Sequence, residues 1–282
     1  MIIKIINDFL KKWIIPESIY EFIRSVLSKL YGWLLLLNKN IRLTLRINKK
    51  FKNIHEGERC FIVANGPSII KQNILPLKNE HVFFINKGWR HKDYKKIKPE
   101  YYCIPKVEES NKESIRWLKF ISKKILKNTS VFLSYYDKNK CEKNKIFQNN
   151  TYFIIHHGSW KNFRFSNLNI VKPIPTISNS PMMCIQIAIY MGFKEIYLLG
   201  TDYDFLTHYG KSTHFYKEKT IVWHDIWGTY EDCVKTFLQI MNEYRSIKLY
   251  SERRGIKIYN ATLGGYLEVF RRKNLNSLFV KQ

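Results

Sequence analysis

The chain has 282 residues, 45% of them hydrophobic, which is enough to bury a sizeable core and too much for an intrinsically disordered protein. Its 48 Lys and Arg against 23 Asp and Glu give a formal net charge of +25, so an anionic partner is expected. Nucleic acid, an anionic membrane and phosphorylated substrates all meet that expectation, and an AT-rich genome would also enrich Lys. Charge alone therefore selects no function.

The cysteines are odd in number, far apart and never in a C-x-x-C pair: Cys60, Cys103, Cys141, Cys184 and Cys233. Such spacing predicts neither a disulfide framework nor a zinc site built from cysteines. A reducing compartment, the cytoplasm, fits this pattern.

The first 37 residues are apolar but repeatedly interrupted by charges, and the longest uncharged stretch, 30–38, is shorter than the ~20 residues that span a bilayer. Two amphipathic helical patterns meet at Pro16, and a basic run follows over residues 39–52. Aromatic and basic residues together favour a helix lying on an anionic membrane surface. We predict that residues 1–55 form such a segment, peripheral to the inner face of the cytoplasmic membrane. Alternatively, it packs on the main domain or on a second copy in a homo-oligomer.

From residue 59 onward, short apolar runs alternate with helical patterns, which predicts an α/β fold with a Rossmann-like, mostly parallel sheet and flanking helices over residues 56–282. The expected strands are 60–64, 81–86, 101–105, 130–136, 151–157, 194–200 and 256–262. The expected helices are 108–127, 180–192 and 230–254. We interpret residues 137–150 as a surface loop and 204–229 as an active-site loop or lid.

The turn Asn65-Gly66-Pro67-Ser68 follows the first strand directly. Ligands of open α/β sheets bind beyond the carboxyl ends of strands, where Gly66 permits close approach and Ser68 offers a hydroxyl to a phosphate. The alternative is a tight turn with a helix cap. Neither G-x-G-x-x-G nor a P-loop is present, which argues against a standard dinucleotide or P-loop site. Asn260 and Thr262 also follow a strand, and they either complete the nucleotide site or form a capped turn.

Two blocks resemble family 42 bacterial sialyltransferases, which have a GT-A-like fold: CFIVANGPSI with FFINKGW, and SNSPMMCIQIAIYMGFKEIYLLGTDY. The resemblance implies that Asn65, Gly66, Pro67, Ser68 and Asn86 hold the CMP of a donor sugar. It also implies that Ser178, Asn179, Ser180 and Asp202 meet its ribose, phosphate and sugar carboxylate. With residues 214–216 and IYNATLGGYLEVF, the chain further resembles motility-associated flagellin glycosyltransferases, surface-polysaccharide proteins and an archaeal hydroxymethylpterin pyrophosphokinase.

The general base is expected to be a histidine, because imidazole accepts a proton near pH 7. His224 matches the position of the base in family 42, and His214 is the second candidate. By the same resemblance, Tyr203, Tyr209 and Tyr216 are candidates for stabilising the leaving phosphate, although their spacing departs from the family by one residue or more. Because phenolic donors can stabilise a single leaving phosphate without a divalent ion, neither a metal nor another cofactor is expected.

These features predict a glycosyltransferase of surface-glycan biosynthesis (lipopolysaccharide, capsule or flagellin). It would move a CMP-activated acidic sugar, such as sialic acid or another nonulosonate, to a glycan acceptor. One option for that acceptor is a lipid-linked glycan. Three alternatives stay open: a Mg²⁺- and ATP-dependent pterin pyrophosphokinase, a basic nucleic-acid-binding protein, and a catalytically silent scaffold. The nucleic-acid alternative lacks a helix-turn-helix, RRM or zinc pattern, so no specific nucleic acid is expected.

Overall fold

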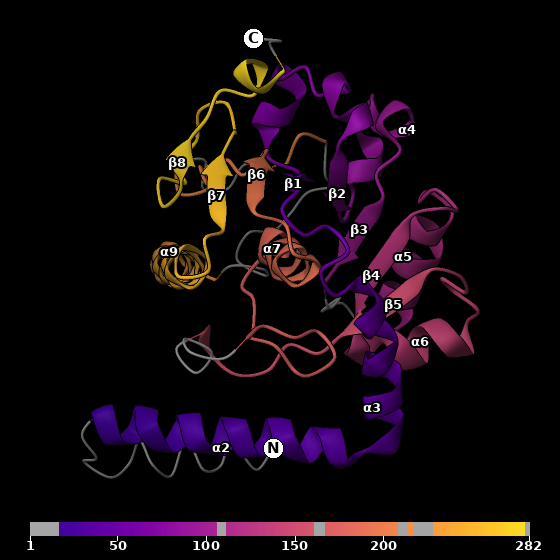
Figure 1. Ribbon diagram of the computed structural model, residues 1–282, viewed down its shortest axis with the longest axis vertical. Helices are drawn as coiled ribbons and strands as arrows, with labels where there is room; N and C mark the ends of the chain where they lie inside the picture. Colours follow the sequence, from indigo (N-terminus) through magenta and orange to yellow (C-terminus); the bar gives the residue numbers. More distant parts are fainter. Residues whose placement is uncertain (1–16, 106–110, 161–166, 208–213, 217–227, 280–282) are drawn as a thin grey trace.

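The computed structural model describes residues 17–105, 111–160, 167–207, 214–216 and 228–279, and a sheet of eight parallel strands runs through it (Figure 1). The strands are β1 (Arg59–Val63), β2 (His81–Ile85), β3 (Tyr101–Ile104), β4 (Ser130–Ser134), β5 (Thr151–Ile154), β6 (Glu195–Leu199), β7 (Lys257–Asn260) and β8 (Arg271–Arg272). The first seven confirm the predicted strands, with ends that differ by up to three residues. β8 falls where no strand was predicted.

Helices cover both faces of the sheet, which explains why its central strands are nearly continuous apolar runs. One face packs α7 (Ser180–Met191) and α9 (Tyr230–Glu252) against alternate strand residues such as Ile62 and Leu198. The other face packs α4 (Tyr94–Ile97), α5 (Asn111–Ser122) and α6 (Lys138–Lys143) against residues such as Phe61 and Leu199. The predicted parallel α/β fold is thereby confirmed.

The strand order is β5-β4-β3-β2-β1-β6-β7-β8, so the chain first builds outward from β1 and then returns to its other side. β1 pairs with β2 on one side and with β6 on the other. The order of the strands thus reverses between β1 and β6. Open α/β sheets bind their ligands at the carboxyl ends of the strands, at such a switch point.

The predicted helices agree with the structure in type, and their ends follow from local signals. α7 starts at its N-cap Asn179 and ends at Gly192, whose φ of 95° lies in the left-handed region that favours glycine. α9 begins with a reciprocal capping box between Thr229 and Asp232. The predicted surface loop 137–150 is wrong in part, because residues 138–143 form α6 and the buried Cys141 anchors it.

Short 3₁₀ helices occupy several connections: η1 (Ile47–Phe51), η2 (Pro67–Lys71), η3 (Leu75–Asn79), η4 (Gly88–Arg90), η5 (Tyr135–Asp137) and η7 (Asn276–Leu278). They were not predicted, since one turn of helix carries no measurable hydrophobic period. All five cysteines are buried, and each is a free thiol in the described structure.

The N-terminal segment contains α2 (Glu17–Leu37) and α3 (Lys39–Arg46), and Figure 1 shows α2 extending past the sheet domain. α3 packs on the end of β5 through Ile41, Leu45 and Ile155. By contrast, α2 exposes a stripe of large apolar side chains: Ile19, Val26, Leu27, Leu30, Trp33, Leu34 and Leu37. Within the described ranges, no helix combines the length and apolarity that crossing a bilayer demands. Pro16, the predicted break, lies outside the described residues.

Candidate functional site

The loops after β1 and β6 meet at the switch point through Ser68 and Asp202. The Ser68 backbone amide donates to Asp202 Oδ1 at 2.9 Å and its hydroxyl donates to Oδ2 at 2.8 Å. Burial raises the pKa of the Asp202 carboxyl, and the two Ser68 bonds partly oppose that rise. The predicted helix-capping role of Ser68 is wrong, since Ser68 lies inside η2 and its hydroxyl bonds to Asp202.

Gly66 has no room for a side chain. A Cβ at this position would lie 1.9 Å from Asp202 Oδ2 and 2.5 Å from the Gly200 carbonyl oxygen. The Gly66 amide also donates to that carbonyl at 2.8 Å. The glycine is therefore required for the contact between the two loops, while Pro67 starts η2 with a fixed φ.

Asn65 places an unpaired acceptor beside the switch point. The residue is 4% exposed, and its Nδ2 donates to the Ile85 carbonyl at 3.4 Å. Its Oδ1 is buried and has no partner among the described residues. A buried polar atom that lacks a partner is costly, so its retention suggests a bound group that donates to it. The backbone carbonyl of Asn65 accepts from the Phe215 amide at 2.9 Å, which holds residues 214–216 against this turn.

The carboxyl end of β2 meets the amino end of α7 through Asn86 and Ser180. Asn86 has a left-handed φ of 45°, and its Nδ2 donates to Ser180 Oγ at 2.7 Å. Ser180 is the first residue of the 12-residue helix α7, whose N-terminus carries a partial positive charge. The first and second sequence blocks thus contact each other at this edge of the sheet.

Asn179 supplies an unpaired donor close by. Its Oδ1 caps α7 and also accepts the Tyr244 hydroxyl at 3.0 Å. Its Nδ2 is buried and finds no partner in the part of the chain that the structure describes. Tyr244 in turn shares a hydrogen bond of 3.2 Å with the Tyr203 hydroxyl. Ser178 is held separately by Glu243, through its amide at 3.0 Å and its hydroxyl at 2.7 Å.

Two cations and an aromatic pair lie on the other flank of Asn65. Lys87 Nζ and the Arg90 guanidinium lie 5.2 and 5.3 Å from the centre of the Tyr216 ring. The His214 ring stacks on Tyr216 with centroids 5.0 Å apart and an interplanar angle of 8°. His214 and Tyr216 therefore lie beside the Asn65 turn, close to two positive charges.

The predicted site residues that remain are His224, Tyr209, Tyr203, Asn260 and Thr262. His224 and Tyr209 lie outside the described residues. Tyr203 is turned into the core against Tyr244 with a left-handed φ of 53°, and burial raises the pKa of both phenols above their usual value. Its hydroxyl supports Asn179 through Tyr244, a role the sequence did not indicate.

Asn260 and Thr262 form a capped turn, which is one of the two roles that the sequence left open for them. Asn260 Nδ2 donates to the Leu267 carbonyl at 2.7 Å and its Oδ1 accepts from the Thr262 amide at 3.0 Å. Thr262 Oγ1 accepts the Thr201 amide at 3.0 Å, which fixes the residue before Asp202.

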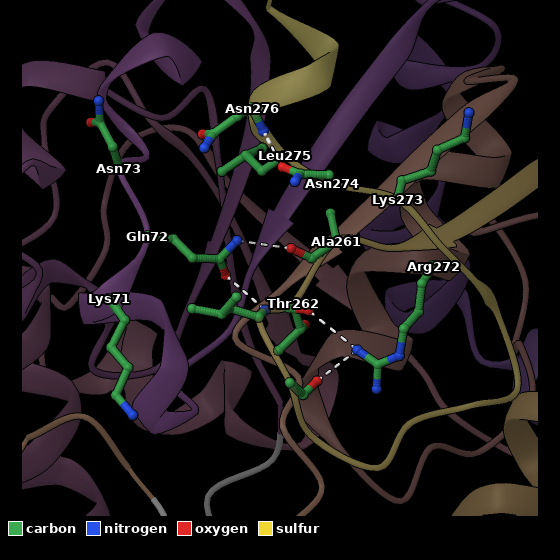
Figure 2. A pocket seen from close by; sticks show the side chains of 12 residues that line it. Lys71, Gln72, Asn73, Ala261, Thr262, Arg272, Lys273, Asn274, Leu275 and Asn276 are labelled. Atoms are coloured by element: carbon green, nitrogen blue, oxygen red, sulfur yellow. Dashed lines mark hydrogen bonds between the residues drawn. The ribbon is translucent and has the colours of Figure 1, made fainter.

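A pocket of about 550 Å³ opens beside Thr262, and Figure 2 shows side chains from the loops after β1 and β7 and from the C-terminal segment around it. Within its wall, Gln72 bonds to backbone groups of Ala261 and Leu263, and Arg272 bonds to the carbonyls of Thr262 and Gly264. Its other polar groups include the amides of Asn73, Asn274 and Asn276 and the ammonium groups of Lys71 and Lys273. Such a lining suits a hydroxyl-rich or anionic ligand.

Four residues of the site were missed by the sequence: Lys87, Arg90, Glu243 and Tyr244. Lys87 carried a signal, because it directly follows Asn86 at a strand end. Glu243 and Tyr244 carried none, since their side chains reach the site only through the position of α9 across the sheet.

The model of the family described as 6-hydroxymethylpterin diphosphokinase MptE-like matches residues 35–208, which include both sequence blocks. The chain belongs to this MptE-like family. No curated protein matches it.

Solved structures similar to this MptE-like chain include the MAf glycosyltransferase of Magnetospirillum magneticum AMB-1, with a TM-score of 0.49 and 16% identity. The similarity covers 86% of this chain and 39% of the MAf chain, so the present chain spans well under half of that protein. The sialyltransferase CstII from Campylobacter jejuni, solved with cytidine-5'-monophosphate, has a TM-score of 0.45 and 15% identity over 78% of this chain and 86% of its own. A CST-II complex with a trisaccharide acceptor and CMP gives 0.45 and 19%, over 79% and 89%.

Proposed function

We propose that this MptE-like protein is a glycosyltransferase that moves a CMP-activated acidic sugar, such as sialic acid or another nonulosonate, to a surface-glycan acceptor. The proposal is carried by two buried amide groups at the carboxyl edge of the sheet, Asn65 Oδ1 and Asn179 Nδ2, neither of which has a partner within the described ranges. One acceptor and one donor suit the edge of a nucleobase or ribose. The α7 N-terminus, Lys87 and Arg90 suit a single phosphate and a sugar carboxylate.

The proposed reaction needs a base and a stabilised leaving group. The acceptor hydroxyl attacks the anomeric carbon, its proton passes to an imidazole, and the bond between that carbon and the phosphate oxygen breaks, releasing CMP. His224 and His214 are the candidates for the base. We assign the phenol that donates to the departing phosphate to Tyr216, supported by its place beside Lys87 and Arg90, whereas Tyr203 faces the core. In this proposal no metal is required.

Nucleotide binding is the direct test. Calorimetric titration of the whole chain with CMP, CDP, UDP and GDP, with and without Mg²⁺, is expected to show binding of CMP that does not depend on Mg²⁺. Asn65→Ala and Asn179→Ala should each weaken CMP by about tenfold or more, the loss expected for one or more hydrogen bonds. Asn144→Ala, a distant surface change on the loop after α6, serves as the control. Absence of a response to every cytidine nucleotide rejects the donor assignment.

The base is identified by separate His224→Ala and His214→Ala variants. Removal of the catalytic base should lower turnover of a CMP-sugar donor by about 10²–10⁴-fold, while CMP binding is retained. Unchanged turnover in both variants rejects a histidine base. Loss of CMP binding together with turnover assigns the residue to the binding site instead.

Attachment to an anionic membrane is the second part of the proposal, supported by the apolar stripe on α2 and the exposed basic residues beside it: Lys39, Arg42, Arg46, Lys49, Lys50 and Lys52. The protein should sediment with vesicles containing phosphatidylglycerol and much less with phosphatidylcholine alone. Leu30→Glu with Trp33→Glu should abolish sedimentation, whereas Phe120→Glu, at an equally exposed site on α5, should not. Self-association without vesicle binding would instead assign the stripe to a second copy.

The family description favours one other function, diphosphate transfer from ATP to a 6-hydroxymethylpterin. This reaction calls for Mg²⁺ held by carboxylates at the strand ends. Asp202 lies there, but Ser68 engages both of its oxygens, and Asp204 follows two residues later. Mg²⁺-dependent ATP binding, tested in the same calorimeter, would select this function over glycosyl transfer.

A further inference from the structure

At the amino edge of the sheet, opposite the Asn65 turn, two imidazoles and two carboxylates converge. His55 and Glu58 precede β1, His81 begins β2 and Glu100 precedes β3. One ligand atom of each of His55, His81 and Glu100 lies within 4.8 Å of the others. Glu58 Oε2 lies 2.6 Å from His55 Nδ1 and 3.1 Å from His81 Nε2, so its carboxylate bridges the two rings.

The rings are already oriented by neighbours that occupy their other nitrogens. His81 Nδ1 bonds to Glu100 Oε2 at 2.6 Å, and His55 Nε2 bonds to the Tyr101 hydroxyl at 2.6 Å. The His55 ring also stacks on Phe193, with centroids 4.5 Å apart. Metal-binding histidines almost always bond through their second nitrogen to a carboxylate or another polar partner, which fixes the ring and its tautomer.

The exposure of the four side chains and the freedom of the two carboxylates to turn also suit a cation. The two imidazoles are 12% and 28% exposed, whereas the side chains of Glu58 and Glu100 are 51% and 48% exposed. The nitrogens are thus held by the fold, while the carboxylates lie at the surface and have room to turn toward an incoming ion. Metal bonds of about 2.0–2.2 Å place tetrahedral ligand atoms about 3.4 Å apart. Donors that are now hydrogen-bonded at 2.6 Å would therefore separate on binding, and those up to 4.8 Å apart would approach.

We infer that this cluster is a binding site for a transition-metal cation, with Zn²⁺ as the best match, in which His55 and His81 are ligands together with the carboxylate of Glu58 or Glu100. Imidazole and carboxylate donors suit Zn²⁺, whereas Mg²⁺ prefers an octahedron of oxygens. The ligands come from three separate segments, which is why no metal motif appears in the sequence.

The expected role is structural. The segment that carries His55 bonds to the end of α7, through Asn53 to Tyr190, His55 to Met191 and Gly57 to Gly192. A metal ion shared with His81 and Glu100 would also tie this segment to the starts of β2 and β3. It would fix the junction between the N-terminal helices and the sheet, far from the nucleotide-binding turn, and it is independent of the proposed reaction.

Calorimetry of the EDTA-stripped, full-length chain tests the site. We expect one Zn²⁺ to bind per chain, with no response to Mg²⁺, and the melting temperature to rise with Zn²⁺. His55→Gln and His81→Gln should weaken Zn²⁺ at least about 100-fold, the upper end of the loss caused by changing outer partners. Glu58→Gln and Glu100→Gln are compared in the same titration. The variant with the larger loss of Zn²⁺ affinity identifies the ligand, and the other carboxylate is the one that orients a histidine. His157→Gln, outside the cluster, should bind as the wild type does.

A readout on the unmodified chain covers the case in which a variant fails to fold. Zn²⁺ should protect His55 and His81 from diethyl pyrocarbonate, as read by mass spectrometry, and leave His157 unprotected. The proposal is overturned if the wild type binds no Zn²⁺, if folded His55→Gln and His81→Gln bind as tightly as His157→Gln, or if protection is absent.

Discussion

Ser68 and Asp202, 134 residues apart in the sequence, are joined by two hydrogen bonds of 2.9 and 2.8 Å at the point where the strand order reverses. The contact closes the loops after β1 and β6 on each other. Gly66 lies two residues before Ser68 and bonds to the Gly200 carbonyl, and Thr201, next to Asp202, bonds to the Thr262 hydroxyl. The position of Asn65 therefore depends on the contact between the two loops.

Ser68→Ala removes the hydroxyl and leaves Asp202 Oδ2 buried without that donor. The free energy of unfolding should fall by about 1–3 kcal/mol, the cost of an unsatisfied buried group. Urea denaturation measures the change, and Ser122→Ala, whose hydroxyl bonds to a helix carbonyl near the surface, should cost less than about 0.5 kcal/mol. Equal losses in the two variants would contradict the role of the Ser68 bond.

Gly66→Ala should abolish nucleotide binding and destabilise the fold, because the new methyl group would meet Asp202 Oδ2 at 1.9 Å. Gly32→Ala in α2 is the matched control, since its methyl group would meet only His157 at 3.5 Å. In the control, a helical glycine becomes alanine, which should stabilise by about 0.5–1 kcal/mol. Thermal melting and CMP titration of both variants provide the comparison, and normal CMP binding by Gly66→Ala would refute the close contact.

Asp202 should make stability depend on pH in a defined direction. Its pKa in the folded protein is raised above 3.8 by burial, so between pH 3.8 and that higher pKa the folded state retains a proton that the unfolded state has lost. Stability contributed by this group is therefore lost as pH rises through the folded pKa. Asp202→Asn, whose amide can still bond to Ser68, should gain melting temperature relative to wild type as pH rises from 4. A difference that stays constant with pH would reject this account.

His156 should act in the opposite direction. Burial lowers its pKa from 6.5 to about 4, with Nε2 bonded to the Oε1 of Gln186 at 3.0 Å. As pH falls from 6.5 toward 4, the unfolded chain takes up a proton that the folded ring refuses, and stability declines by at most about 3 kcal/mol. His156→Gln, which keeps a donor for Gln186, should flatten this decline in urea unfolding measured across that window. His157→Gln should leave it intact.

The fold was largely predictable because its strands are buried on both sides. Residues 60–64 and 194–200 are apolar runs bounded by turns, a pattern that fits central parallel strands and little else of that length. The strand order was not predictable, since nothing local states that β6 returns to the free side of β1. The two-residue β8 escaped for another reason: Arg271 and Arg272 are exposed at the sheet edge and carry no hydrophobic pattern.

The site was predictable where a residue is fixed by its place at a strand end. Asn65, Asn86 and Asp202 end up together because parallel strands share a carboxyl edge. The partners of these residues were not predictable. Glu243 and Tyr244 reach Ser178 and Asn179 from the middle of a long helix, and the unpaired atoms of Asn65 and Asn179 are visible only once all neighbours are placed.

The pairing of β1 with β6 also sets the order in which the protein is completed during translation. β1 emerges from the ribosome long before residues 195–199, so one of its edges stays unpaired while most of the chain is being made. Parallel pairings this distant in sequence form slowly. A nascent chain stalled before β6 should therefore recruit chaperones, and slower growth in the cold should raise the yield of folded protein.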